Sequence, residues 1–270
     1  MPQSPILILS DIHYGHPLGR LRDLNALRPL LEGVKTLIIN GDFTEARQGA
    51  NLSDALSRVQ ALKSRCIDWG VELIMLTGNH DGTLYNRHWL SLAGGKVLVT
   101  HGDCLYWDVA PWSPEVEAYR EAWQAHHGEW YLAAARGWDA LLAYTRARSA
   151  DVKDCGNHFA RGSGGTLRSI WRLASKPGRI ARMMKVWATS HRIAERIVRR
   201  LSPQTKFFIY GHTHHSIVRN VRGLQVINTG AWHACATTRI VRLDEKTLSV
   251  GKITFKGEAI QVAWEKEFPL

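Results

Sequence analysis

The stretch Ile6-Leu7-Ile8-Leu9-Ser10-Asp11-Ile12-His13 joins an apolar run directly to two side chains that bind metals, Asp11 and His13. Four later blocks repeat this arrangement: Gly41-Asp42, Gly78-Asn79-His80-Asp81, Thr100-His101-Gly102-Asp103 and Gly211-His212-Thr213-His214. Carboxylate, amide and imidazole groups at the carboxyl ends of buried strands are the ligands that a two-cation hydrolytic centre needs. We therefore predict a metal site made of seven residues: Asp11, His13, Asp42, Asn79, His101, His212 and His214.

The pattern between these blocks predicts an α/β fold. Strand-like apolar runs precede most blocks, at residues 6–9, 37–40, 73–77, 97–100 and 207–210. Helical patterns over residues 22–31 and 52–69 alternate with the first of these runs, and such alternation favours a sheet covered by helices. The tail contains four more strand-like runs, at 224–228, 237–243, 248–255 and 259–263. We expect these four to form a second, mostly antiparallel sheet packed on the first.

The pattern changes between the His101 block and residue 206. Residues 114–150 are aromatic and helical, residues 151–165 are rich in Gly, Ser and Asn, and two basic helical segments follow at about 166–175 and 178–201. A turn signal, Lys176-Pro177-Gly178, separates these two segments. We therefore predict a single domain over residues 1–270, with a helical cap inserted at residues 105–205.

Composition and cysteine usage exclude several classes of protein. Hydrophobic residues make up 45% of the chain and charged residues 22%, which is typical of a globular protein and not of a disordered one. The amino terminus lacks a basic segment followed by an apolar run, and no stretch approaches the ~18 apolar residues of a spanning helix. The four cysteines form no CxxC pair, which argues against a zinc ribbon and a disulfide framework. We expect a cytoplasmic protein that can also lie peripherally at the inner membrane face.

The seven ligand-type residues suit two divalent cations. Mixed nitrogen and oxygen ligands accept Mn, Fe, Zn or Ni, of which we place Mn first. Two such ions held ~3.5–4 Å apart can clamp the attacking and leaving oxygens of a phosphoryl displacement. One carboxylate must then bridge the ions, and Asp42 is the candidate, since Gly41 lets the backbone turn just before it. Asp11 with His13, and His212 with His214, are spaced two apart, so each pair points to one side of an extended segment.

In these ordered blocks the chain resembles the calcineurin-like metallophosphoesterase superfamily, whose signature reads D-x-H, G-D, G-N-H-D/E, a lone His and G-H-x-H. The resemblance implies a four-layer αββα sandwich. It also implies that Asp11, His13, Asp42 and His214 hold one metal, and that Asp42, Asn79, His101 and His212 hold the other. His80 would stabilise charge on the phosphate or protonate the leaving oxygen, oriented by Asp81. The implied nucleophile is a hydroxide that bridges the metals.

Local motifs narrow the substrate class. The run Gly41-Asp42-Phe43-Thr44-Glu45-Ala46, and His101-Gly102-Asp103-Cys104-Leu105 followed by Asp108, look like the UDP-2,3-diacylglucosamine diphosphatases of lipid A biosynthesis. Those enzymes carry a helical insertion that covers acyl chains. Their third block usually reads G-N-R-D, whereas this chain has His80 in the Arg position. The resemblance implies a phosphorylated, amphipathic small-molecule substrate such as UDP-2,3-diacylglucosamine.

The charge of the chain is concentrated in one segment. The net charge of the whole chain is +11. Most of it comes from the segment between Arg161 and Arg200, which contains eleven Lys or Arg residues and a single acid, Glu195. Residues 178–201 alternate an apolar helical face with basic positions, which is typical of a helix that binds a membrane interface. An equally favoured reading is that the apolar face packs on the preceding aromatic helices while the charges are solvated. The candidates for contact with substrate or an anionic membrane are Arg192, Arg196, Arg199, Arg200 and Trp187.

Two other functions remain open from the sequence. A phosphodiesterase or phosphatase acting on nucleotides or nucleic acid would use the same basic segment against phosphates, and its binding would weaken steeply with salt. A metal-free binding scaffold of the same fold is the more remote alternative, since all seven ligand-type residues and His80 are present. The oligomeric state is not readable from the sequence.

Overall fold

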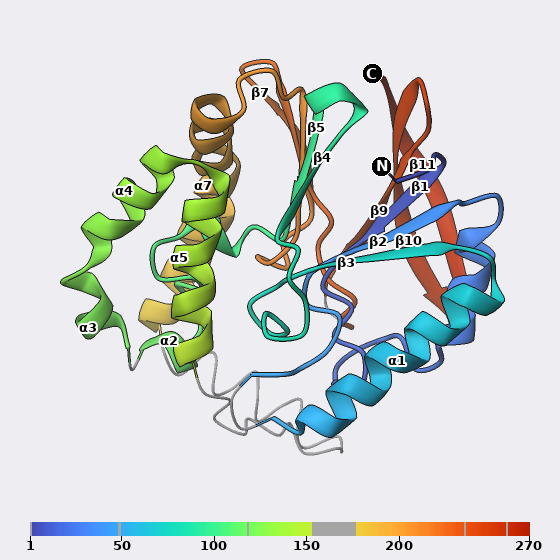
Figure 1. The fold of residues 1–270 in the computed structure, drawn as a ribbon, viewed down its shortest axis with the longest axis horizontal. Helices are drawn as coiled ribbons and strands as arrows, with labels where there is room; N and C mark the ends of the chain where they lie inside the picture. Colours follow the sequence, from blue (N-terminus) through green and yellow to red (C-terminus); the bar gives the residue numbers. More distant parts are fainter. Residues whose placement is uncertain (1, 48–49, 118, 153–176, 235, 258) are drawn as a thin grey trace.

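Two sheets packed face to face form the centre of the molecule. The computed structural model describes residues 2–47, 50–117, 119–152, 177–234, 236–257 and 259–270 (Figure 1). The six-stranded sheet has the order β11-β10-β9-β1-β2-β3 and the five-stranded sheet the order β4-β5-β6-β8-β7. The first sheet contains β1 (Ile6–Leu9), β2 (Thr36–Asn40), β3 (Glu72–Leu76), β9 (Thr238–Leu243), β10 (Thr247–Lys256) and β11 (Ala259–Pro269). The second contains β4 (Trp89–Leu92), β5 (Val97–Thr100), β6 (Phe207–Tyr210), β7 (Ile217–Val221) and β8 (Leu224–Asn228).

Helices cover the outer face of each sheet. The helix α1 (Leu52–Asp68) and the 3-10 helix η1 (Leu24–Leu31) lie on the six-stranded sheet, and α4 (His127–Arg136), α5 (Trp138–Asp151) and α7 (Pro177–Leu201) lie on the five-stranded sheet (Figure 1). The shorter helices are α2 (Pro114–Glu117), α3 (Arg120–Gln124), η2 (Ala93–Gly95) and η3 (Asp103–Leu105).

Alternate side chains along each strand divide the core into layers. In β1, Leu7 and Leu9 pack under α1 and η1, whereas Ile6 and Ile8 face the other sheet. Successive side chains of a strand point to opposite faces, so a strand buried on both sides must be apolar at every position. All four residues of β1 are buried. The result is the four-layer αββα sandwich that the sequence predicts.

The tail strands are distributed differently from the expectation. We expected residues 224–263 to form a separate second sheet, but β8 pairs in parallel with β6 in the five-stranded sheet. The strands β9, β10 and β11 instead extend the first sheet, because β9 pairs antiparallel with the free edge of β1, with Ile6 opposite Leu243. The strands β4 and β7 are additional to the expected ones. The helical pattern over residues 22–31 forms a 3-10 helix with Pro29 inside it.

The basic segment over residues 178–201 forms α7, and its apolar face is packed. Ala194, Ile197 and Val198 are buried in one cluster with Trp138 of α5 and Phe208 of β6. The packing reading of this face is therefore correct for these residues. The expected helix at 166–175, and all but the first two residues of the stretch 151–165, lie outside the described residues. In the part of the chain that is described, no helix is long and apolar enough to cross a membrane.

Candidate metal centre

All seven predicted ligands lie at the same ends of their strands. Asp11 and His13 follow β1, Asp42 follows β2, and Asn79 follows β3. From the second sheet, His101 follows β5, and His212 and His214 follow β6. The site therefore lies where the parallel strands of both sheets end, which is where open α/β sheets bind their ligands.

The first group of ligands consists of Asp11, His13, Asp42 and His214. One ligand atom from each lies within 4.8 Å of the ligand atoms of the other three. The Nε2 atoms of His13 and His214 are 3.2 Å apart, and His214 Nε2 is 3.3 Å from Asp11 Oδ1. His13 Nε2 lies 3.9 Å from Asp42 Oδ2. These separations are those of atoms that can share one ion with bond lengths of about 2.0–2.2 Å.

The second group consists of Asp42, His101 and His212, together with Asn79. His101 Nε2 lies 3.2 Å from Asp42 Oδ2, the same oxygen that faces the first group. The amide oxygen of Asn79 lies 3.1 Å from His101 Nε2 and 2.8 Å from His212 Nδ1. Asp42 is thus the one residue common to both groups, as expected of a bridging carboxylate.

In each histidine of the second group, the ring nitrogen that does not face the other ligands is hydrogen-bonded to a backbone carbonyl. His101 Nδ1 donates to the carbonyl of Asn40 at 3.1 Å, and His212 Nε2 donates to the carbonyl of Val109 at 2.8 Å. Since a carbonyl only accepts, this nitrogen of each ring carries the proton, and the other nitrogen offers a lone pair whenever the ring is neutral. Those two nitrogens face Asn79 and Asp42, and imidazoles held in this way are typical of metal ligands. The residues present therefore fit a pair of divalent ions.

Much of the ligand backbone is held in a left-handed conformation. Five of the seven ligands have positive φ angles: Asp11 50°, His13 48°, Asp42 53°, His212 65° and His214 54°. Few residues other than glycine adopt this region, and such strain is concentrated at functional sites. Two of these carboxylates lie so close to a neighbouring loop that the loop has room only for a glycine, at Gly211 beside Asp11 and at Gly78 beside Asp42. A Cβ at Gly211 would overlap Asp11 Oδ2, and one at Gly78 would overlap Asp42 Oδ1.

The structure gives His80 a different partner from the one implied by the resemblance. His80 Nδ1 lies 2.6 Å from Glu45 Oε2, and its Nε2 lies 3.9 Å from Asp42 Oδ2. Asp81 is buried and instead accepts backbone N–H groups of Gly78 at 2.8 Å and Phe43 at 2.7 Å. The expectation that Asp81 orients His80 is therefore wrong, because its side chain turns inward to hold the loop that carries Asp42.

Burial and mutual charge shift several pKa values in the site. Burial raises the pKa of Asp42, but His101, His80 and His13 together hold it well below its usual range. Burial lowers the pKa of His101, and the adjacent Asp42 carboxylate outweighs this and raises it to about 9. Burial also opposes ionisation of Glu45, yet His80 and Arg47 lower its pKa to about 2. Glu45 is therefore a carboxylate, and His80 lies between two anions.

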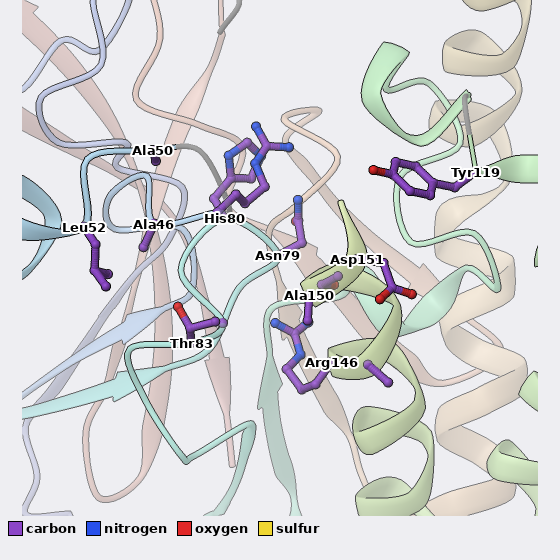
Figure 2. Close-up of a pocket in the computed structure, with 14 residues that line it drawn as sticks. Ala46, Ala50, Leu52, Asn79, His80, Thr83, Tyr119, Arg146, Ala150 and Asp151 are labelled. Carbon is purple, nitrogen blue, oxygen red and sulfur yellow. The ribbon is translucent and has the colours of Figure 1, made fainter. Parts of the chain in front are cut away.

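A cavity of about 1160 Å³ opens beside His80 and Asn79. Figure 2 shows these two residues between the loop side, with Ala46, Leu52 and Thr83, and the α5 side, with Arg146, Ala150 and Asp151. Arg146 was not anticipated from the sequence. It donates to the carbonyl of Gly78 and pairs with Asp103, and so it ties α5 to the ligand loop.

The candidate residues of α7 divide into two kinds. Trp187 Nε1 donates to the carbonyl of Thr213 at 3.0 Å. In the sequence, Thr213 stands between the predicted ligands His212 and His214. Arg199 donates to the carbonyls of Pro203 and Arg222. Arg192, Arg196 and Arg200 are exposed, and none of the four arginines belongs to the described lining of the cavity beside His80.

Residues 4–216 match the family model of the calcineurin-like phosphoesterases, and the chain belongs to this family. No curated protein matches the chain significantly. Among solved structures, a dimetal phosphatase from Danio rerio is similar, with 15% identity, a TM-score of 0.46, and coverage of 97% of this chain and 99% of that one. Vacuolar protein sorting 29 from Cryptosporidium parvum has 12% identity and a TM-score of 0.44, covering 98% and 97%. Wild-type Vps29 from Entamoeba histolytica, complexed with Zn²⁺, has 13% identity and a TM-score of 0.42, covering 98% of both chains.

Proposed function

We propose that this chain is an active hydrolase of phosphoester or pyrophosphate bonds that depends on two divalent ions. The observation that carries the proposal is the shared oxygen of Asp42, Oδ2, which lies 3.2 Å from His101 and 3.9 Å from His13. A structural metal site would need only one closed group of four ligands. Two adjoining groups that share a carboxylate are instead suited to two-ion phosphoryl chemistry.

The bound ions would supply a nucleophilic water of lowered pKa and would neutralise charge on the phosphate. Mn, Fe, Zn and Ni all suit the ligands, and Mn²⁺ is our first choice for assay. His80 is the general acid in this proposal. Its Nδ1 donates to Glu45, which leaves Nε2 directed towards Asp42 and free to give a proton to the leaving oxygen.

We further propose that the substrate is amphipathic. The cavity beside His80 combines the cationic Arg47 and Arg146 with apolar Leu52 and Tyr119. Arg47 is paired with Glu45 and Arg146 with Asp103, so an anionic phosphate would share these guanidinium groups with the two carboxylates, while an apolar body would contact Leu52 and Tyr119. The local motifs shared with UDP-2,3-diacylglucosamine diphosphatases make that nucleotide–sugar lipid the first candidate. The histidine at position 80, where those enzymes carry arginine, is the feature that sets this chain apart from them.

The outer surface of α7 is proposed to meet an anionic membrane. Arg192, Arg196 and Arg200 are exposed there, and each basic residue near an anionic leaflet contributes about 1 kcal/mol to binding. A lipid-linked substrate would be reached from that surface, so the chain would act at the cytoplasmic face of the membrane. Arg199 is left out of this set because its guanidinium is already bonded to backbone carbonyls.

A turnover screen of the purified, metal-loaded full chain tests both parts of the proposal. The substrates are UDP-2,3-diacylglucosamine, an aryl phosphodiester, cyclic nucleotides and single-stranded DNA. Asp42→Ala provides the background rate. Hydrolysis of the lipid substrate above all others is the expected result. Faster hydrolysis of cyclic nucleotides or DNA would contradict the proposed lipid substrate. Equal rates for wild type and Asp42→Ala on every compound would contradict the proposal that the chain is a hydrolase.

A further inference from the structure

His233 lies beside the first ligand group although it belongs to none of the five sequence blocks. It sits in the loop after β8, where it forms an antiparallel bridge with Gly19. The neighbouring Trp232 donates its backbone N–H to the carbonyl of Asp11 at 3.0 Å. Its carbonyl accepts from the backbone N–H of Arg20 at 2.7 Å. The backbone next to His233 is therefore fixed against the strand end that carries the first two ligands.

The rings of His13, His214 and His233 form a nearly equilateral triangle. Their centroids are 5.0 Å apart for His13 and His233, and 5.1 Å apart for the other two pairs. One ring nitrogen from each lies within 4.8 Å of a ring nitrogen of the other two. The pair His101 and His212, which belongs to the second ligand group, also has a centroid separation of 5.1 Å.

These separations can be compared with the geometry of imidazoles on a common ion. With metal–nitrogen bonds of about 2.1 Å, each ring centroid lies roughly 3.2 Å from the ion, so rings at angles of about 90–110° have centroids roughly 4.5–5.2 Å apart. All three distances of the triangle fall in this range. His80 also lies 5.0 Å from His13, but among the described ring pairs it forms no such triangle with His214 and His233, and His16 lies 6.2 Å from His13.

We propose that His233 is a further protein ligand of the ion held by Asp11, His13, Asp42 and His214, an inference that rests on the dinuclear site proposed above. The Nδ1 atom of His233 is buried and has no hydrogen-bond partner among the described residues. The ring is thus not held at this atom in the way that backbone carbonyls hold His101 and His212. A bound ion would give this nitrogen the partner that it lacks.

A third imidazole changes which ions the first position prefers. His233 forms a group with His13 and His214 but not with the carboxylates of Asp11 and Asp42, so its binding would add a third nitrogen ligand to the two that His13 and His214 supply. Imidazole suits Zn, Ni, Cu and Fe, whereas oxygen-rich sets suit Mg and Mn. The first position should therefore discriminate more strongly for Zn²⁺ over Mn²⁺ than the four other ligands alone would.

Cobalt substitution of three variants tests this assignment. His233→Cys places a thiolate where the imidazole stands, and His233→Phe keeps a ring that can stack on His13 but cannot bind a metal. His16→Phe is the matched control, since it changes a neighbouring imidazole that belongs to none of the ligand groups. Thermal unfolding of each apoprotein confirms that the variants fold, and the absorption of the Co²⁺ forms is compared with wild type.

We expect Co²⁺-loaded His233→Cys to show a near-ultraviolet thiolate-to-cobalt band that wild type lacks. In competition with a chelator, His233→Phe should bind one of its two Zn²⁺ ions at least about tenfold more weakly than wild type does. The loss of affinity for Mn²⁺ should be smaller. His16→Phe should match wild type. Absence of the band, together with unchanged affinities in His233→Phe, would overturn the role of His233 alone. Failure of the wild-type chain to bind two ions would instead reject the dinuclear site.

Discussion

Glu45 and His80 are joined by a hydrogen bond of 2.6 Å that crosses from the loop after β2 to the loop after β3. Burial and Arg47 lower the pKa of His80, but the carboxylates of Glu45 and Asp42 outweigh them and raise it. A histidine with a raised pKa stays protonated to higher pH, so it can act as a general acid over a wider range.

The first prediction concerns the pH profile of turnover. Glu45→Gln removes a charge that raises the pKa of His80, so the alkaline limb of kcat/KM should move to lower pH. Arg47→Gln removes a charge that lowers the same pKa, so its alkaline limb should move to higher pH. Steady-state rates from pH 5 to 10 provide the measurement. Shifts of the same sign in both variants would contradict the claim that the charges of Glu45 and Arg47 move the pKa of His80 in opposite directions.

The second prediction separates catalysis from metal binding. His80→Ala should lower kcat by about 10²–10⁴-fold, the usual contribution of general acid–base assistance. Its metal content, measured by mass spectrometry of the digested protein, should equal that of wild type, since His80 belongs to neither ligand group. A wild-type rate in this variant would remove His80 from the mechanism.

The third prediction concerns stability. Gly211→Ala places a Cβ against Asp11 and Ser10, and overpacking of this kind costs about 1–3 kcal/mol. Gly128→Ala, at an exposed position of α4, meets no atom within 4 Å and should stabilise the fold by about 0.5–1 kcal/mol. Urea denaturation of the two apoproteins gives the free energies of unfolding. Equal effects of the two substitutions would contradict the tight packing inferred at Gly211.

The fourth prediction tests the proposal that the outer surface of α7 binds an anionic membrane. Replacing Arg192, Arg196 and Arg200 with glutamine should weaken sedimentation with vesicles of anionic phospholipid by up to about 100-fold at low salt. The control replaces the exposed Arg28, Lys63 and Arg65, which carry the same charge on the opposite outer layer. Equal binding by both triple variants would show that α7 has no special affinity for the membrane.

The sequence predicted the parts of the fold and site that depend on local pattern. The strands at 6–9, 97–100 and 207–210 were located to the residue, because each apolar run ends at a ligand block. The seven side chains predicted as metal ligands lie together, since the carboxyl ends of parallel strands meet at one edge of a sheet. β4 and β7 were missed because their partly exposed residues lack a strong apolar pattern.

What the sequence did not reveal depends on contacts between distant residues. The place of β9 follows from the pairing of Ile6 with Leu243, which no local signal encodes. Glu45 was not chosen as the partner of His80, since Asp81 is adjacent in sequence and only the turn geometry directs it inward. Arg146 reaches Gly78 from 68 residues away.

Metal stoichiometry of four forms of the protein tests the central claim most directly. Each is dialysed against Mn²⁺ and analysed by mass spectrometry. We predict two ions per chain for wild type, about one each for His101→Ala and His214→Ala, and neither ion held tightly by Asp42→Ala, whose carboxylate is common to both groups. If Asp42→Ala retained two ions with the affinity of wild type, the shared dinuclear centre would be contradicted.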